Sequence, residues 1–216
     1  MTFKSKKSVG QKVKKLNVKG AVKQEQILEA AIRRLSHFGV HKTTLTEIAD
    51  DLSISKQALM YYYHDKASLV TSVLEKIAGD YIVEVKKLMA KNLSLNHLFT
   101  GLVDMRHSFF GRYHMLFIQM KTDGFTRSSS EIEATRKQAE QAERIALAER
   151  LKSEITQGTI REIDTDTTVQ LMLDTMAAFA YSMQFTCPIP TEDQLQQLFD
   201  RQKNAVLLMI NGITTK

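Results

Sequence analysis

The sequence contains one cysteine, Cys187, two prolines, Pro188 and Pro190, and no tryptophan among 216 residues. A lone cysteine cannot form an internal disulfide, which is typical of proteins in a reducing cytoplasm. Proline interrupts helices, and its near absence leaves long uninterrupted helices open to most of the chain. We therefore expect an all-α, cytoplasmic protein.

Several motifs that carry chemistry are also missing. There is no run of 18 apolar residues to span a membrane and no apolar leader segment. The zinc, nucleotide and nucleophile-elbow motifs do not occur, and His37 and His41 lack cysteine or carboxylate partners for a metal. Cys187 has no histidine nearby in the sequence to activate it. We expect no cofactor, no metal and no enzyme activity.

Charge is distributed unevenly. Residues 1–66 carry 13 Lys and Arg against 6 Asp and Glu, whereas the remaining 150 residues carry 17 against 18. A basic head on a nearly neutral body favours contact with a polyanion such as nucleic acid. Residues 1–21 hold seven lysines and no acid, and we expect a disordered arm. This arm either follows DNA phosphates or enters the minor groove, or it is only a solvated tail.

Residues 44–63 have the pattern of two short helices joined by a tight turn. Leu45, Ile48, Ala49 and Leu52 lie on one helical face. Thr44 and Glu47 form a capping box in front of this helix. After a break at residues 53–54, Ser55 caps a second segment, residues 56–63. This is the arrangement of a helix-turn-helix, whose second helix enters the major groove.

Residues 23–75 resemble the DNA-binding domain of the TetR (tetracycline-repressor-like) regulators. The matching motifs are Ile27-Leu28-Glu29-Ala30-Ala31, Phe38-Gly39, Thr43-Thr44, Ile48-Ala49, Ile54-Ser55-Lys56-Gln57-Ala58-Leu59, Lys66 and Leu69. One departure is Met60, which stands where the family usually has a tyrosine that bonds a phosphate, and a thioether cannot donate that bond.

Ile27, Ala31, Leu35 and Phe38 fall along one stripe, which predicts a first helix at residues 22–38, ahead of the helix-turn-helix. The resemblance implies three parts: an arm (1–21), a DNA-binding domain (22–68) and a helical effector-binding and dimerisation domain (69–216). Gln57 is the best candidate to reach a base edge, because a carboxamide can pair with one. The DNA-contacting residues that we predict are Thr43, Thr44, Ser55, Lys56, Gln57, Tyr61, Tyr62 and Lys66.

Beyond the head, residues 65–89 have an apolar position every fourth residue and read as one long helix. Residues 95–122 are rich in phenylalanine and methionine, which suit either an adaptable apolar pocket or an ordinary core. The resemblance implies a ligand cavity in this stretch. The candidate ligand-binding residues are Met105, Phe109, Phe110, Tyr113, Phe117 and Met120.

After a long charged helix at residues 131–157, the last two segments, 166–185 and 191–210, read as antiparallel amphipathic helices. Such a hairpin suits pairing with a second copy into a four-helix bundle, as the family resemblance also implies. The alternative is a hairpin whose apolar faces are used within the chain. The candidate dimer residues are Met172, Met176, Phe179, Met183, Leu195, Phe199, Gln202 and Val206.

These patterns predict a homodimeric, sequence-specific DNA-binding transcriptional regulator on a pseudo-palindromic operator. The expected partners are double-stranded DNA, a second copy and a small apolar or amphipathic effector, with no membrane. Release of a repressor by its ligand is the usual behaviour of the family. The alternative, motivated by Met60, is a ligand-sensing or interaction module with weak or nonspecific DNA binding.

Overall fold

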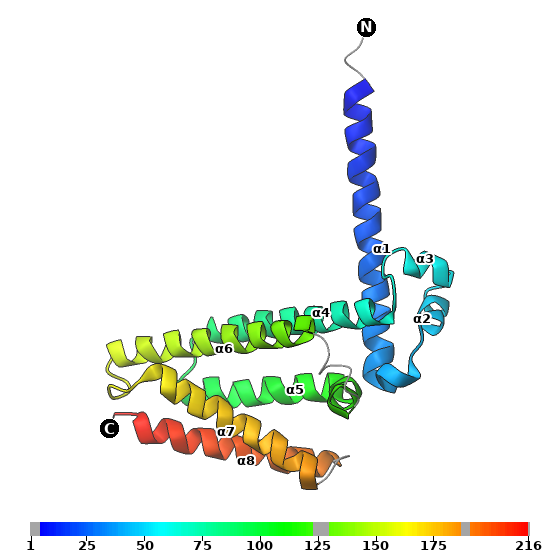
Figure 1. The fold of residues 1–216 in the computed structure, drawn as a ribbon. Coiled ribbons are helices and arrows are strands. Elements are labelled where there is room, and N and C mark those ends of the chain that lie inside the picture. The colour runs from blue at the N-terminus through cyan, green and yellow to red at the C-terminus, as the bar shows by residue number, and fades with distance from the viewer. Residues whose placement is uncertain (1–4, 123–129, 187–190, 216) are drawn as a thin grey trace. The chain divides into compact units, whose positions relative to one another are not determined.

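The computed structural model describes residues 5–122, 130–186 and 191–215. In these ranges the chain is helical, and its one β-type contact is an isolated bridge between Ile160 and Thr214, so the expected all-α class is confirmed (Figure 1). The helices are α1 (Ser5–Lys42), α2 (Leu45–Asp51), α3 (Lys56–Met60), α4 (Lys66–Met89), α5 (Leu95–Thr122), α6 (Ser130–Thr156), α7 (Thr165–Thr186) and α8 (Glu192–Ile213).

The chain forms two compact units. The first comprises Met1–Lys76 with Tyr113–Ile132, and the second comprises Ile77–Arg112 with Glu133–Lys216. The boundary lies inside α4, eight residues after the expected domain boundary at 68. The first turns of α4 belong to the first unit because Val70 and Val73 are fully buried, and Lys76 Nζ lies 4.0 Å from Glu25 Oε1 on α1.

Helix α1 is longer than predicted. It begins at Ser5 and therefore includes most of the lysine-rich segment that was expected to be disordered. That segment has no proline, and lysine has a high helix propensity, so nothing in it stops the helix from extending toward the N-terminus. At the other end, Gly39 has φ of +80°, a left-handed conformation that favours glycine and breaks the regular helix where the sequence predicted.

The predicted buried stripe of α1 is correct for Ile27, Ala31 and Leu35, which are at most 1% exposed. It is wrong for Phe38, whose side chain is 45% exposed. Its ring contacts the ring of His37 at 4.5 Å and lies under the Arg34 guanidinium. Phe38 lies close to the break at Gly39, so it lies outside the run of core contacts.

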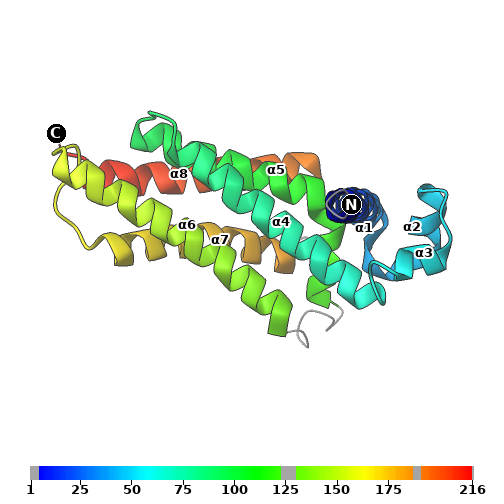
Figure 2. The same ribbon diagram turned by 90° about the horizontal axis from the view of Figure 1, so that it is seen from above.

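The second unit is a helical bundle in which α7 and α8 run antiparallel (Figures 1 and 2). Its core combines Phe99 and Leu102 of α5 with Leu147 and Leu151 of α6, all fully buried. Hydrogen bonds join the C-terminal residues to the segment between α6 and α7. Arg161 N–H donates to Ile213 O, and Thr215 N–H donates to Thr159 O. None of the helices in the described ranges has the length and hydropathy needed to cross a membrane.

Helix α5 covers the same residues, 95–122, as the phenylalanine- and methionine-rich stretch of the sequence. Its backbone departs from helical geometry at Tyr113 (φ −116°, ψ 18°). Gly101 stays helical. A Cβ there would lie 3.3 Å from Leu88 Cδ1, so glycine at this position permits the close approach of α4 and α5.

Candidate nucleic-acid interface and effector region

Helices α2 and α3 are held by the caps that the sequence predicted. Glu47 N–H donates to Thr44 Oγ1 at 3.2 Å, and Thr44 N–H donates to Glu47 Oε2 at 2.7 Å, which completes the capping box. Leu45, Ile48 and Ala49 form the buried face of α2. Ser55 caps α3, with Ala58 N–H donating to its Oγ at 3.1 Å. Each cap satisfies an otherwise unpaired amide of a helix too short to be stable alone.

The turn and one anchor orient α3. Ser53 takes a left-handed φ of 51°, which reverses the chain between α2 and α3. Leu59 is fully buried, and Tyr63 just beyond the helix is 5% exposed, so both fix the inner face. The opposite face is therefore presented outward, with Lys56 and Gln57 exposed. This is the surface that a recognition helix needs.

Two tyrosines follow α3 and differ in their surroundings. Tyr61 is 84% exposed, whereas Tyr62 is only partly exposed. Their rings meet edge to face with centroids 5.2 Å apart. Tyr62 therefore supports the ring of Tyr61, whose hydroxyl is the more accessible donor.

Thr43 is a correction to the predicted DNA contacts. Its side chain is 1% exposed, and its hydroxyl donates to Gly39 O at 2.9 Å. This hydrogen bond ties Thr43 to the break in α1 at Gly39. The neighbouring Thr44 is exposed, but its hydroxyl already donates to Glu47 Oε2 at 2.9 Å. Thr43 therefore shapes the entry to α2 and does not face DNA.

Lys66 opens α4 directly after Asp65, which caps the helix by accepting from Ser68 N–H at 2.8 Å. The lysine is partly buried. Burial lowers the pKa of Lys66, and the charge of Glu47 partly offsets that effect. Lys66 therefore lies close enough to the capped start of α2 for its charge to interact with that of Glu47.

A bidentate ion pair fixes α1 to α2. Arg34 Nε lies 2.5 Å from Asp51 Oδ2, and its Nη2 lies 2.9 Å from Asp51 Oδ1. Glu47 is 3.6 Å from the same guanidinium. Paired nitrogens in a planar fork give this contact both strength and a defined orientation. It holds the first helix of the helix-turn-helix against α1.

We predict that this contact titrates in acid. The hydrogen bond from Arg34 lowers the pKa of Asp51 below its ordinary value of 3.8. Because the folded-state pKa is depressed, the contact contributes stability above about pH 4 and loses it as pH falls through the lower folded value. A ¹³C NMR titration of the Asp51 carboxyl should give a midpoint below 3.8 in the wild type and a return toward it in Arg34→Met. An identical midpoint in both proteins would contradict the assignment.

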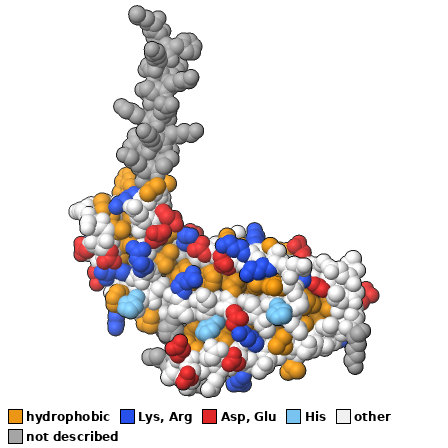
Figure 3. Space-filling view, turned by 180° about the vertical axis from the view of Figure 1, so that it is seen from behind, with side chains coloured by type: hydrophobic (Ala, Val, Ile, Leu, Met, Phe, Trp, Pro, Cys, Tyr) orange, Lys and Arg blue, Asp and Glu red, His pale blue; other side chains and the backbone are white. Residues whose placement is uncertain are grey.

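The structure does not bring the candidate ligand-binding residues together at one site. Met105 and Phe109 line a groove of about 640 Å³ between α4 and α5 in the second unit, bounded by Asp80, Val83, Glu84, Lys87, Asp104, Ser108 and Arg112. Phe110 instead packs against the core. Tyr113 is buried and belongs to the first unit. The side chains of Phe117 and Met120 lie outside the described ones. Figure 3 shows hydrophobic side chains among charged ones along the second unit.

The predicted dimer stripe is mostly an internal face. Met172, Met176, Phe199 and Val206 are 6% exposed or less and belong to the core of the single chain. Gln202 is also buried and donates from Nε2 to Met176 O at 2.8 Å. These five residues are therefore not a surface for a second copy. Leu195 packs partly against the same core, Phe179 lies under Arg201, and the Met183 side chain is outside the described ones.

The outward faces of the same helices carry different apolar residues. Leu171 and Tyr181 of α7 are 55% and 60% exposed, and Leu208 of α8 is 74% exposed. The amphipathic pattern correctly predicted two antiparallel helices. Their more apolar stripe, however, packs within the chain and not against a second copy. That stripe packs on α5 and α6, because a hairpin of two long helices first has to cover its own core.

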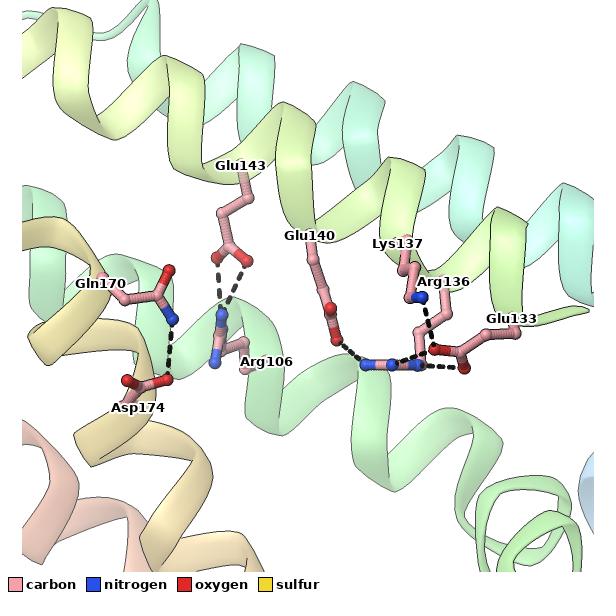
Figure 4. Close-up of polar contacts among 8 residues, drawn as sticks. All are labelled: Arg106, Glu133, Arg136, Lys137, Glu140, Glu143, Gln170 and Asp174. Atoms are coloured by element: carbon pink, nitrogen blue, oxygen red, sulfur yellow. Dashed lines mark hydrogen bonds and ion pairs between the residues drawn. The ribbon is translucent and has the colours of Figure 1, made fainter. Parts of the chain in front are cut away.

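The sequence reasoning missed a polar network inside the second unit. Arg106 Nη2 of α5 donates to Glu143 Oε2 of α6 at 2.7 Å (Figure 4). Tyr81 of α4 donates its hydroxyl to Glu143 Oε1 at 2.8 Å and accepts from Arg106 Nε at 3.2 Å. The only hint in the sequence was a glutamate amid the apolar positions Ala139, Ala142 and Ala146. Three helices are joined by this network.

Burial raises the pKa of Tyr81 above its ordinary value of 10, so its hydroxyl remains a donor at neutral pH. Glu143 is 3% exposed, whereas Arg106 keeps 26% exposure. By contrast, Arg136 of α6 pairs with Glu133 and Glu140 at more exposed positions (Figure 4). Exposed pairs of that kind contribute little to stability. Breaking the buried network is therefore expected to cost more stability than breaking these exposed pairs.

Comparison with known proteins bears on the head and on the fold separately. Residues 27–73 match the family model described as "Bacterial regulatory proteins, tetR family". The HTH-type transcriptional regulator RutR of Escherichia coli K12 is 36% identical over 66 residues, which are 31% of this chain and 31% of RutR. This chain therefore matches about a third of the length of that relative.

Solved structures share the fold over nearly the whole chain. A transcriptional regulator from Cytophaga hutchinsonii superposes with a TM-score of 0.79 at 20% identity, covering 89% of this chain and 99% of that one. FadR from Bacillus subtilis, solved in complex with stearoyl-CoA, gives a TM-score of 0.64 at 16% identity, covering 88% and 98%. Residues 27–73 thus resemble the DNA-binding part of the TetR family, and the chain shares its helical fold with these solved structures.

Proposed function

We propose that this protein is a sequence-specific DNA-binding transcriptional regulator that acts in the cytoplasm as a homodimer on a pseudo-palindromic operator. The observation that carries the proposal is the outward face of α3, where Lys56 and Gln57 are exposed opposite the fully buried Leu59. In the major groove, such a helix offers a cation for phosphates and a carboxamide for a base edge. Two heads would read half-sites about 34–36 Å apart or somewhat more.

The homodimer forms, in this proposal, through the outer faces of α7 and α8. Leu171, Tyr181 and Leu208 supply exposed apolar area there. Ala177 and Ala178 are exposed on the same side of α7 and would let a second helix approach closely. A self-complementary face of this kind is what a two-fold interface requires.

The effector in this proposal is a small apolar or amphipathic molecule that binds the second unit and releases the repressor from DNA. The groove is lined by the apolar residues Val83, Met105 and Phe109 together with charged residues of α4 and α5. FadR of Bacillus subtilis, which has a similar fold, was solved with stearoyl-CoA, a ligand with apolar and charged parts. To lower operator affinity, the effector must bind the DNA-incompetent state more tightly.

In-vitro selection from a random DNA pool at near-physiological salt tests the proposal. Enrichment of an inverted repeat is the expected result. On that operator, Lys56→Ala should weaken binding by about tenfold for all sequences, since one charged hydrogen bond of about 1.5 kcal/mol is lost. It should also reduce the salt slope by about one. Gln57→Ala should instead relax preference at one position, with a loss of about 1–3 kcal/mol of discrimination.

The second candidate function is a ligand-sensing or interaction module with weak or nonspecific DNA binding. It is favoured by Met60, which is 41% exposed where a hydrogen-bond donor to phosphate was expected. Salt-dependent binding with no enriched motif would support this reading and overturn the first. An equal loss on every sequence for Gln57→Ala would remove that residue from base readout.

A further inference from the structure

The outward face of α3 continues past Gln57 with two large side chains. Tyr61 N–H donates to Gln57 O at 3.1 Å, so helical spacing holds from Gln57 through Tyr61. Residues three and four apart lie on the same face of a helix, which places Met60 and Tyr61 directly beyond Gln57. Met60 is 41% exposed and Tyr61 is 84% exposed.

A single exposed methionine is common on protein surfaces. Here the position matters, because Met60 follows the one exposed carboxamide of α3 by one turn. Its thioether cannot donate the phosphate hydrogen bond that a tyrosine at this position would make, so Met60 offers only apolar contact on this face. The buried Leu59 beside it fixes the rotation of the helix, which keeps Met60 outward with Gln57.

The major groove has matching groups. A glutamine carboxamide pairs with the N6 and N7 groups of adenine, and the C5-methyl of thymine is the apolar group on that edge. Side chains three residues apart have Cβ atoms about 5–6 Å apart, and base pairs stack at about 3.4 Å. Neighbouring contacts from Gln57 and Met60 therefore fall one or two base pairs apart.

We propose that Met60 is a specificity-determining residue that packs against the methyl group of a thymine, one or two base pairs from an adenine bound by Gln57. The inference rests on the proposed function, since it names the bases that the recognition helix reads. It assigns two A·T base pairs to each half-site. Tyr61, with its accessible hydroxyl, contacts the phosphate backbone of the DNA in this arrangement and does not contact the thymine methyl group.

The test removes only that methyl group. In the selected operator, each thymine is replaced in turn by deoxyuridine, and affinity is measured by fluorescence anisotropy at fixed salt. One thymine per half-site should be sensitive, with the wild type losing about fourfold, which corresponds to about 0.8 kcal/mol for one buried methyl. Met60→Ala should bind the thymine and deoxyuridine operators equally.

Tyr61→Phe is the matched control. It should weaken binding while preserving the fourfold ratio between the two operators. Met60 is exposed, so Met60→Ala should keep the wild-type melting temperature. An enriched motif in which no thymine is sensitive, or a ratio that persists in Met60→Ala, would overturn this inference alone. The absence of any enriched motif would overturn the proposed function and the inference with it.

Discussion

Glu143→Ala is expected to lower the free energy of unfolding by about 3 kcal/mol, because it strips a buried guanidinium of its partner. Glu143 is 3% exposed and binds Arg106 at 2.7 Å. The expected loss is at the lower end of the range for broken buried pairs, since Arg106 retains 26% exposure and can regain some water. Urea denaturation of the full chain, followed by circular dichroism, measures the change.

Glu140→Ala is the matched control for this variant. Glu140 lies one turn earlier on α6, faces solvent and pairs with Arg136. Exposed pairs contribute roughly 0–1 kcal/mol, so this substitution should shift stability only slightly. Equal effects of Glu140→Ala and Glu143→Ala would contradict the assignment of Glu143 as a buried anchor.

Two further variants separate charge from packing. Arg106→Met combined with Glu143→Leu should recover most of the lost stability, because replacing both members of a buried pair by apolar residues is often neutral. Tyr81→Phe should cost about 1 kcal/mol, the usual net contribution of one hydrogen bond. If the double variant does not recover stability, the network stabilises the fold by more than the mutual neutralisation of its two charges.

The most accurate predictions concern features that depend on interactions between neighbouring residues. The predicted capping box of Thr44 with Glu47 and the predicted cap at Ser55 both form as expected, because a cap depends on residues within one turn. The helix-turn-helix followed from those caps and from apolar spacing. Gly39 and Gly158 take the positive φ values expected at helix ends. These features require no knowledge of distant contacts.

The predictions were wrong where contacts between residues far apart in the sequence determine the structure. An amphipathic pattern states that a face is buried but not what buries it, so Met176 and Phe199 were assigned to a second copy when the chain's own core covers them. Thr43 is adjacent to an exposed cap in the sequence, but its hydroxyl is used by Gly39 O. Arg106 and Glu143 are 37 residues apart, and no local pattern joins them.

Leu208→Glu is expected to convert the proposed dimer to a monomer. Leu208 is 74% exposed on α8, and in a two-fold interface each substitution occurs twice. Burying two unpaired carboxylates costs several kcal/mol, so the dimer dissociation constant should rise by at least about 100-fold. Sedimentation equilibrium at micromolar concentration should then give a mass of 24.6 kDa instead of twice that value.

Val83→Glu provides the comparison, because Val83 is also apolar and half exposed but lies on α4, away from the α7–α8 hairpin. It should remain dimeric. Since both half-sites must be engaged together, Leu208→Glu should also lose operator affinity by about 100-fold or more, because the second head no longer binds at a high effective concentration. Retention of the dimer mass in Leu208→Glu would show that another surface carries the contact, and equal dissociation of both variants would point to a general effect of added charge.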